Sequence, residues 1–158
     1  MKNKLLLIGA GLLIAGALLY EEYRKLKDFK ISLNKIKMKD ISATNISIDA
    51  TFNFTNKSIY KFTLVEQIYE VYFNDVQIAH IQSNDQSIVY PKTTSLLPVN
   101  IQSNPSSLKG KLNLVSILKP SSVLRIETKL KVNFHGIMFD VPFTYSTKIG
   151  DLLTKKDS

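Results

Sequence analysis

The chain has 158 residues, of which 44% are hydrophobic and 22% are charged, and it contains no cysteine. This length accommodates one domain with a single core, and the composition is that of a folded chain rather than a disordered one. The lack of cysteine excludes disulfides, thiolate metal sites, a cysteine nucleophile and an acylated cysteine. We therefore expect one globular domain.

The formal net charge of +8 is concentrated near the N-terminus: residues 1–39 carry nine basic and three acidic residues. Basic residues flanking an apolar run suit anionic lipid head groups, and each contributes about 1 kcal/mol near such a surface. Nucleic-acid binders instead spread arginine and lysine over a folded face, and this chain has only two arginines, Arg24 and Arg125. The charge pattern therefore predicts membrane lipids as a partner and no nucleic acid.

An unbroken apolar run of 15 residues extends from Leu5 to Leu19, preceded by two lysines and followed by Tyr20 and Tyr23. As a helix it spans roughly 22 Å, and a snorkelling Lys4 and interfacial tyrosines extend its reach toward the ~30 Å hydrocarbon core. The run predicts an N-terminal transmembrane helix. Its expected anchor residues are Leu5, Leu6, Leu7, Ile8, Leu12, Leu13, Ile14, Leu18 and Leu19.

Two other interpretations of this run stay open. Ala15-Gly16-Ala17 has the small residues of a signal-peptide cleavage site, although Leu18 and Leu19 continue the apolar run beyond it. In the second interpretation, the run is a helix buried against protein in a larger assembly. We prefer a retained, single-pass membrane anchor with the domain outside the cytoplasm, because the lysine-bearing, acid-free N-terminus favours the cytoplasmic side.

Apolar and polar residues alternate with period two over most of the chain from residue 28 onward, which predicts β-strands. The pattern is clearest over residues 46–55, where Ile46, Phe52 and Phe54 fall on one face. Asn74-Asp75 and His135-Gly136 are predicted to be the two-residue tips of β-hairpins. A change of parity in residues 29–38 predicts a β-bulge near Asn34-Lys35.

One helix is predicted over Ser106–Leu118, where leucine and valine recur at helical intervals before Pro120. We therefore expect a mainly β fold: an immunoglobulin or fibronectin type III-like antiparallel β-sandwich of about seven strands with one short helix. The expected segments are an anchor with a short helical stalk at 1–27, the sandwich at 28–150 and a frayed polar tail at 151–158.

Residues 46–99 resemble the water-stress and hypersensitive-response (WHy) domain of the type-2 late embryogenesis abundant family. An alternating strand ends in an Asn-led turn at Asn56-Lys57-Ser58, and Ile68–Asp75 matches the family's "x-Tyr-x-Val-Tyr-x-Asn-Gly" pattern before Ile78-Ala79. The later matches are Pro91, Ser95, Pro98, Val99, Ser106–Leu118, Gly136 and Val141-Pro142-Phe143. The chain departs from the family at Lys57, where proline is usual, and at Asp75, where glycine is usual.

The resemblance covers about 115 residues. It implies a non-enzymatic role in stress protection, envelope integrity or binding, and many family members pair this domain with an N-terminal membrane segment. The alternatives from other classes are a structural subunit of a larger assembly such as a phage virion, and a secreted ligand-binding module released by cleavage.

No motif for catalysis or cofactor binding occurs in the sequence. His80 and His135 lack a neighbouring histidine or glutamate at metal-ligand spacing, and no serine elbow, P-loop or paired-carboxylate motif is present. We therefore expect no enzyme activity, no catalytic or metal residues and no cofactor. Core packing and sheet edges explain most of the aromatic residues between Tyr60 and Tyr90, and the outward-facing ones offer a surface for a protein partner or self-association.

Overall fold

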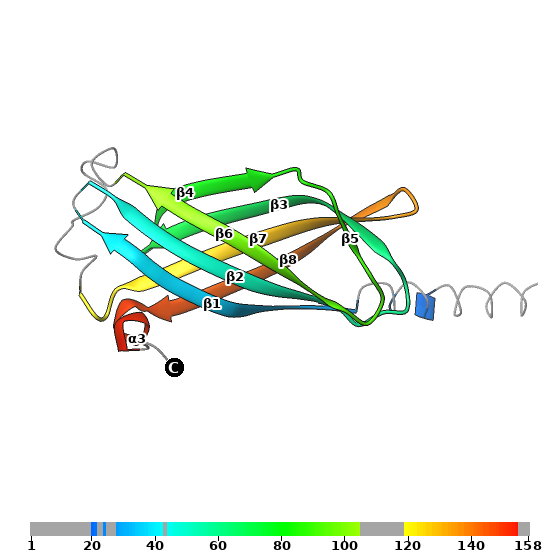
Figure 1. Ribbon diagram of the computed structural model, residues 1–158, viewed down its shortest axis with the longest axis horizontal. Coiled ribbons are helices and arrows are strands. Elements are labelled where there is room, and N and C mark those ends of the chain that lie inside the picture. Colours follow the sequence, from blue (N-terminus) through cyan, green and yellow to red (C-terminus); the bar gives the residue numbers. More distant parts are fainter. Residues whose placement is uncertain (1–19, 22–23, 25–27, 43, 105–118, 155–158) are drawn as a thin grey trace, which may run out of the picture.

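The structure is a computed structural model that describes residues 20–21, 24, 28–42, 44–104 and 119–154. Eight strands form two packed antiparallel sheets, and one short helix follows the last strand (Figure 1). The elements are β1 (Phe29–Ile41), β2 (Ile46–Asn56), β3 (Phe62–Phe73), β4 (Val76–Ser83), β5 (Ser87–Val89), β6 (Thr94–Ser103), β7 (Val123–Phe134), β8 (Ile137–Lys148) and α3 (Ile149–Thr154).

The strands divide into a three-stranded sheet with the order β1-β2-β6 and a five-stranded sheet with the order β4-β3-β7-β8, in which β5 also pairs with β3. Two of the pairings, β2 with β6 and β3 with β7, join strands that are distant in sequence. Each sheet buries the face that carries its apolar residues, as period-two alternation requires. A mainly β fold of two antiparallel sheets is therefore confirmed.

The core lies between the sheets and follows the alternation of the sequence. Ile46, Phe52 and Phe54 of β2 are fully buried, while Asn53 between them is only half-buried. Phe52 packs on Tyr69 of the opposite sheet, with ring centroids 5.8 Å apart. The predicted facing of β2 is therefore correct.

Two irregularities of the sheets have a local origin. The register between β1 and β2 shifts between Leu33 and Lys35, so the bulge predicted there is confirmed; it lets apolar residues on both sides of it face the core. The strand count differs from the predicted seven because β5 is a separate strand. Its three residues are too few to produce an alternating pattern, and its pairing with β3 defines it as a strand.

Helix α3 occupies Ile149–Thr154, where we expected a polar tail to begin at residue 151. Ile149 is 1% exposed and belongs to the core, and Gly150 N donates to Pro120 O at 2.9 Å. Leu152, within the expected tail, also packs against the core, so the start of that tail is tied to the domain. The helix predicted at Ser106–Leu118 lies outside the described residues.

The predicted anchor, Leu5–Leu19, also lies outside the described residues. Within the part of the chain that the structure describes, no helix is long and apolar enough to span a bilayer.

Candidate functional site at the loop end

The two residue pairs that we assigned to hairpin tips lie at opposite ends of the five-stranded sheet. Asn74 and Asp75 connect β3 to β4 with φ values of 45° and 65°, and His135 and Gly136 connect β7 to β8 with φ values of 49° and 88°. Two consecutive positive φ values are the mark of a type I′ turn, whose twist matches that of the strands. The fold does not bring these residues together into one site.

The end of the sandwich at which the chain enters β1 is formed by residues 57–61, 90–93 and 135–138, and we call it the loop end (Figure 1). Asn56, the last residue of β2, is fully buried beneath it. Its side-chain nitrogen donates to Tyr60 O at 2.7 Å and to Tyr90 O at 3.1 Å. Its side-chain oxygen accepts from the amide and the hydroxyl of Ser58 at 2.9 and 2.7 Å. One buried amide therefore holds residues 57–61 against 90–93.

The N-terminal segment joins the domain at this same end. The backbone amide of Lys57 donates to the carbonyl oxygen of Asp28 at 2.9 Å. Phe29, the next residue, stacks on Phe54 at a centroid distance of 5.1 Å and meets the edge of Phe62 at 4.9 Å. These contacts hold the entry point of the chain beside residues 57–61.

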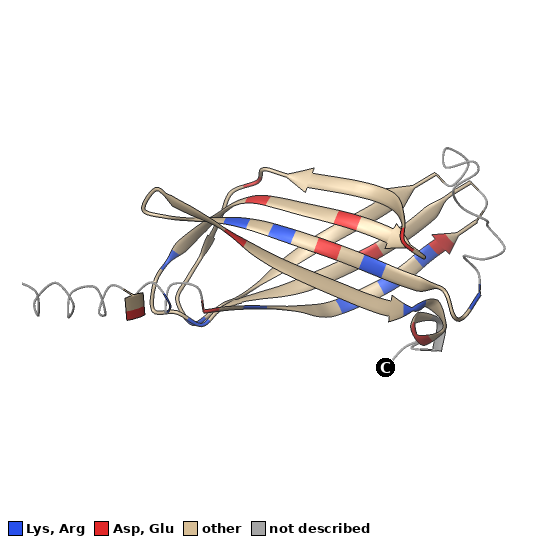
Figure 2. Cartoon of the chain, turned by 180° about the vertical axis from the view of Figure 1, so that it is seen from behind, with Lys and Arg blue, Asp and Glu red and all other residues tan. Residues whose placement is uncertain are grey.

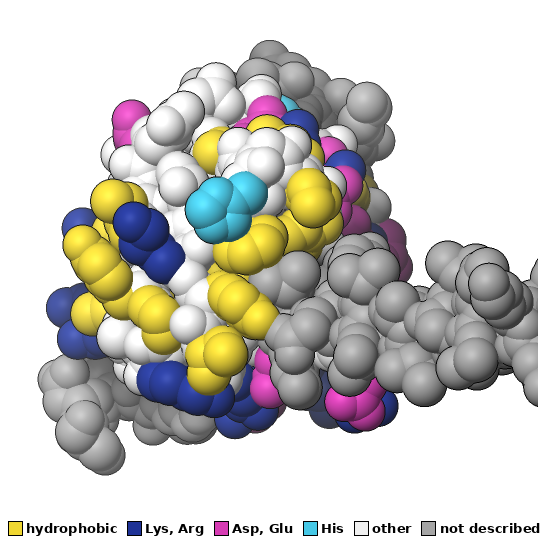
Figure 3. Space-filling model, turned by 90° about the vertical axis from the view of Figure 1, so that its right-hand side faces the viewer, with side chains coloured by type: hydrophobic (Ala, Val, Ile, Leu, Met, Phe, Trp, Pro, Cys, Tyr) yellow, Lys and Arg dark blue, Asp and Glu magenta, His cyan; other side chains and the backbone are white. Residues whose placement is uncertain are grey.

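Exposed hydrophobic side chains collect at the loop end. Eight large hydrophobic residues are exposed in the described part of the chain; Tyr20 precedes the domain and Val123 lies at the far end. The other six lie on the loop end or on adjoining strand residues: Ile59, Ile88, Tyr90, Leu96, Ile137 and Met138. Figure 3 views the molecule from this side and shows hydrophobic and basic side chains mixed across it. Such a gathering on one end is typical of an interaction surface.

The lysines among these hydrophobic residues are Lys57, Lys61 and Lys92, and all three are exposed. The ion pairs found between described residues include none of them. Lys92 Nζ instead donates to the carbonyl oxygen of Lys57. The acidic residues nearest to these lysines in sequence are Asp49 and Glu66, which pair with Lys39 and Lys131, and Asp85, which lies between β4 and β5. The loop end is therefore both apolar and basic.

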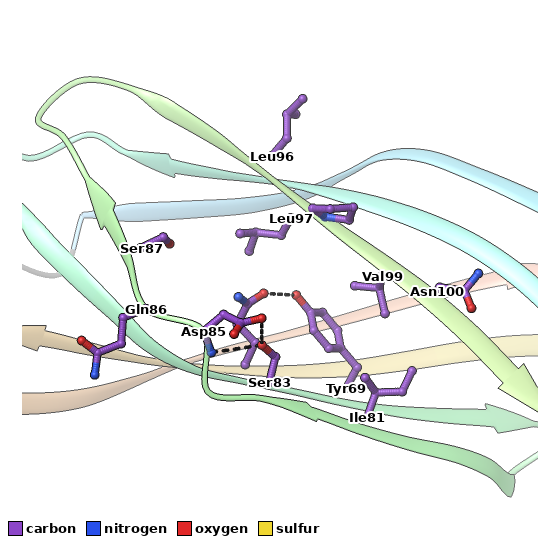
Figure 4. Close-up of a pocket in the computed structure, with 12 residues that line it drawn as sticks. Tyr69, Ile81, Ser83, Asp85, Gln86, Ser87, Leu96, Leu97, Val99 and Asn100 are labelled. Atoms are coloured by element: carbon purple, nitrogen blue, oxygen red, sulfur yellow. Dashed lines mark hydrogen bonds between the residues drawn. The ribbon is translucent and has the colours of Figure 1, made fainter.

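A second feature is a cleft of about 330 Å³ between the edge of β6 and the β4–β5 connection (Figure 4). It opens because β4 and β6 belong to different sheets, and their edges meet farther along, where Ser103 Oγ donates to Ile78 O at 2.6 Å. Its lining includes Gln67, Tyr69, Ile81, Asp85, Leu97 and Val99.

Four polar side chains of the cleft are paired with one another. The hydroxyl of Tyr69 donates to Gln67 Oε1 at 2.8 Å, and Ser83 Oγ donates to Asp85 Oδ2 at 3.0 Å. Burial raises the pKa of Tyr69 above that of an ordinary phenol. The phenol therefore stays protonated at neutral pH and offers no base to a reaction in the cleft.

The outer face of the five-stranded sheet carries basic and acidic side chains along β7 (Figure 2). Lys131 pairs with Glu66 of β3, and Lys129 Nζ lies 2.9 Å from Asp140 Oδ2 of β8. The hydrogen bond from Lys131, followed by one from Gln82, holds the pKa of Glu66 below its usual value. Paired charges of opposite sign make this face unlike the unbalanced basic surface of a nucleic-acid binder.

Farther along the same face, Glu70 and Glu127 lie opposite each other on β3 and β7. Arg125 offsets their repulsion because it pairs with Glu127 and lies 4.3 Å over the ring of Tyr72. The hydroxyl of Tyr72 in turn donates to Glu70 at 2.8 Å, which raises the pKa of Tyr72. The outward Tyr72 is thus engaged within the sheet rather than available to a partner, whereas Tyr90 at the loop end is exposed.

His80 lies on β4 beside Glu70, and His135 lies on the hairpin tip of the loop end. Among the described residues, no group of three histidine, cysteine or acidic side chains is placed to hold a metal ion.

Sequence reasoning missed the loop end as a unit, because its members come from three separate connections. The one signal in the sequence was the Asn-led turn at Asn56, whose buried amide turns out to organise two of those connections.

No protein-family profile and no curated protein matches this chain. Solved structures match its fold. A protein from Archaeoglobus fulgidus superposes with a TM-score of 0.55 at 17% identity, covering 75% of this chain and 96% of its own. A protein from Arabidopsis thaliana, solved in solution, gives a TM-score of 0.59 at 15% identity and covers 75% of this chain and 79% of its own.

A candidate late embryogenesis abundant (LEA) protein, also solved in solution, gives a TM-score of 0.54 at 13% identity. The match covers 94% of this chain and 86% of the LEA chain. At such identities these likenesses establish a shared fold and nothing further. The chain is thus similar in fold to this candidate LEA protein.

Proposed function

We propose that this chain is a non-enzymatic, membrane-anchored β-sandwich protein of the type-2 late embryogenesis abundant kind, with a protective or binding role at an envelope. Its sandwich is of the immunoglobulin or fibronectin type III kind, and its folded domain lies outside the cytoplasm. The observation that carries the proposal is the fold shared with the candidate LEA protein over 94% of this chain.

Two further observations support it. The residues that match the WHy pattern have structural roles in the fold: Asn56 organises the loop end, and Tyr69 and Val71 are buried in the core. The apolar sequence Leu5–Leu19 joins the domain at the loop end, which exposes hydrophobic and basic side chains of its own. The first feature agrees with the shared fold, and the second suits a domain held at a lipid surface.

The anchor is tested by expressing the full-length chain in a bacterial host, measuring its intact mass and fractionating the membranes. We expect the full mass and extraction only by detergent, because an uncleaved apolar helix partitions into the bilayer. A soluble species that lacks about 17 N-terminal residues, as cleavage after a small-residue site predicts, would identify a secreted module. The full mass in a soluble oligomer would identify a subunit of a larger assembly.

The protective role is tested on vesicles that enclose a fluorescent dye. The full-length protein, reconstituted into these vesicles, is expected to reduce dye leakage after drying and rehydration. The matched control is the Phe52→Asp variant, which keeps the N-terminal segment but carries a charge in the core. Equal leakage with both proteins would contradict protection by the folded domain.

A further inference from the structure

From the loop end we infer that the folded domain itself docks on the lipid surface. In this arrangement Ile59, Tyr90, Ile137 and Met138 enter the head-group region, and Lys57, Lys61 and Lys92 contact anionic lipid. The inference rests on the proposed membrane anchor and adds an orientation: the strands point away from the bilayer, and α3 and the Asn74-Asp75 hairpin lie farthest from it.

The apolar side chains of the loop end are arranged for shallow insertion. Ile59 is 66% exposed, Ile137 57% and Met138 50%, although each adjoins a well-packed region. Ile59 lies in the connection between β2 and β3, and Ile137 and Met138 begin β8 next to the hairpin tip, whereas the core side chains of the neighbouring strands point inward. Tyr90, 56% exposed, adds a ring with a polar tip, the residue type that is enriched at membrane interfaces.

The basic side chains match this placement. Lys57 and Lys61 flank Ile59 in sequence, and Lys92 lies two residues after Tyr90. When lysines alternate with exposed apolar side chains, the apolar groups can insert at the acyl boundary while the lysines contact the phosphates of the head groups. Lys129 and Lys131 of β7 are paired with carboxylates, whereas Lys57, Lys61 and Lys92 form no ion pair with a described residue and can contact a partner.

Residues 20–28, which link the predicted anchor to β1, keep the loop end near the bilayer. Nine residues, 20–28, separate Leu19 from Phe29, and Asp28 is bonded to Lys57 of the loop end. Nine residues span at most about 30 Å even when fully extended, so an anchored domain stays within that distance of the membrane. Because the chain enters at the loop end, this end rather than the far end reaches the lipid first.

The connections of the loop end are also held in place before contact. Asn56 fixes residues 57–61 to 90–93, and Thr93 Oγ1 donates to Tyr90 O at 2.8 Å. In residues 135–138, the third segment of the loop end, Gly136 N donates to Asn133 Oδ1 at 2.8 Å. Little conformational entropy is therefore lost when these tips meet lipid, which favours docking.

The lack of cysteine in the native sequence allows a direct test with one fluorescent label at a time. Full-length Met138→Cys carries the label at the loop end. Full-length Ser146→Cys carries it at an exposed position of the same strand, toward the far end. Both are reconstituted into vesicles of phosphatidylcholine and phosphatidylglycerol in equal parts that contain a head-group-linked nitroxide lipid, and both are separated by flotation.

We expect the label at 138 to show blue-shifted emission and strong quenching by the nitroxide, and the label at 146 to behave as in water. Quenching that is equal and weak at both positions in floated vesicles would overturn the docking inference while leaving the anchor intact. Failure of both proteins to float would instead overturn the anchor and the docking together. The two failures are therefore distinguishable.

A charge-reversal pair tests the part played by the lysines. Lys57→Glu with Lys61→Glu, in the Met138→Cys background, is expected to reduce the quenching at 138. Lys119→Glu with Lys148→Glu is the control because it makes the same change of net charge at the far end, on exposed side chains. Loss of quenching in both double variants would show that net charge alone governs the contact and would contradict a defined docking face. Circular dichroism of each variant checks that the sandwich is intact.

Discussion

The side-chain nitrogen of Asn56 donates a hydrogen bond to the carbonyl oxygen of Tyr90 at 3.1 Å, and so joins residues that are 34 positions apart in the sequence. Asn56 closes β2 of the three-stranded sheet, and Tyr90 follows β5 of the five-stranded sheet. This bond therefore links the two layers of the sandwich at the loop end. Its position explains why an asparagine is needed where β2 stops.

Asn56→Ala is expected to lower the free energy of unfolding by about 2–4 kcal/mol, because it removes all four hydrogen bonds of a fully buried side-chain amide. Urea denaturation measures the loss. Asn53→Ala on the same strand is the control, since that half-buried side chain faces outward. A loss of the same size in both variants would contradict the organising role of Asn56.

Phe52→Asp is expected to unfold the domain, because Phe52 is fully buried and a carboxylate there has no partner. Asn53→Asp, one residue along, is expected to change stability by less than about 0.5 kcal/mol, as surface substitutions usually do. Far-UV and near-UV circular dichroism separate the two outcomes. If both variants lost stability equally, the assigned facing of β2 would be wrong.

The two hairpins offer a reciprocal pair of substitutions at the second turn position. Asp75→Gly is expected to raise stability by up to about 1 kcal/mol, because glycine adopts a positive φ without steric cost and the exposed Asp75–Arg125 pair contributes little. Gly136→Ala is expected to lower stability by about 1 kcal/mol.

The cost at Gly136 arises from the backbone alone, since no atom lies within 4 Å of an added Cβ there. Thermal unfolding of both variants measures the pair. A shift of the same sign in the two would contradict the shared turn geometry.

The stability of the domain is expected to fall as the pH rises above 10, the ordinary pKa of a phenol. Burial raises the pKa of Tyr69, so the folded state keeps a proton that the unfolded state releases in this range, and folding becomes less favourable by up to about 1.4 kcal/mol per pH unit. Tyr69→Phe removes this contribution and should flatten the pH profile.

The measurement is urea denaturation of both proteins at neutral pH and at several pH values above 10. The difference between wild type and variant isolates Tyr69 from the other groups that titrate there. Parallel profiles for the two proteins would show that the Tyr69 hydroxyl is accessible to water.

Thr128→Val is expected to stabilise the domain by about 1 kcal/mol. Thr128 is 3% exposed on the core face of β7, and its hydroxyl oxygen lacks a hydrogen-bond partner among the described atoms. Valine keeps the shape and removes the desolvated hydroxyl. Differential scanning calorimetry measures the change in Tm; a lower Tm would indicate that a bound water serves the hydroxyl.

The alternation of the sequence by itself determined the strands other than β5 and their inward faces, because a half-buried strand must repeat with period two. The hairpin tips follow a second local rule, since a type I′ turn needs residues that tolerate a positive φ. The same local logic placed the bulge of β1 near Asn34-Lys35, where the parity of apolar residues changes. These features depend only on neighbouring residues, so a short stretch of sequence is enough to predict them.

Only the tertiary structure decided which strands share a sheet, because the pairings of β2 with β6 and of β3 with β7 join residues that are far apart in the chain. It also decided that β5 is a strand, that Asn56 is a buried support rather than a surface turn residue, and that three separate connections meet at one apolar and basic end. The physical reason is that β5, Asn56 and the loop end are buried or hydrogen-bonded by segments distant in sequence. A local sequence pattern contains no information about those partners.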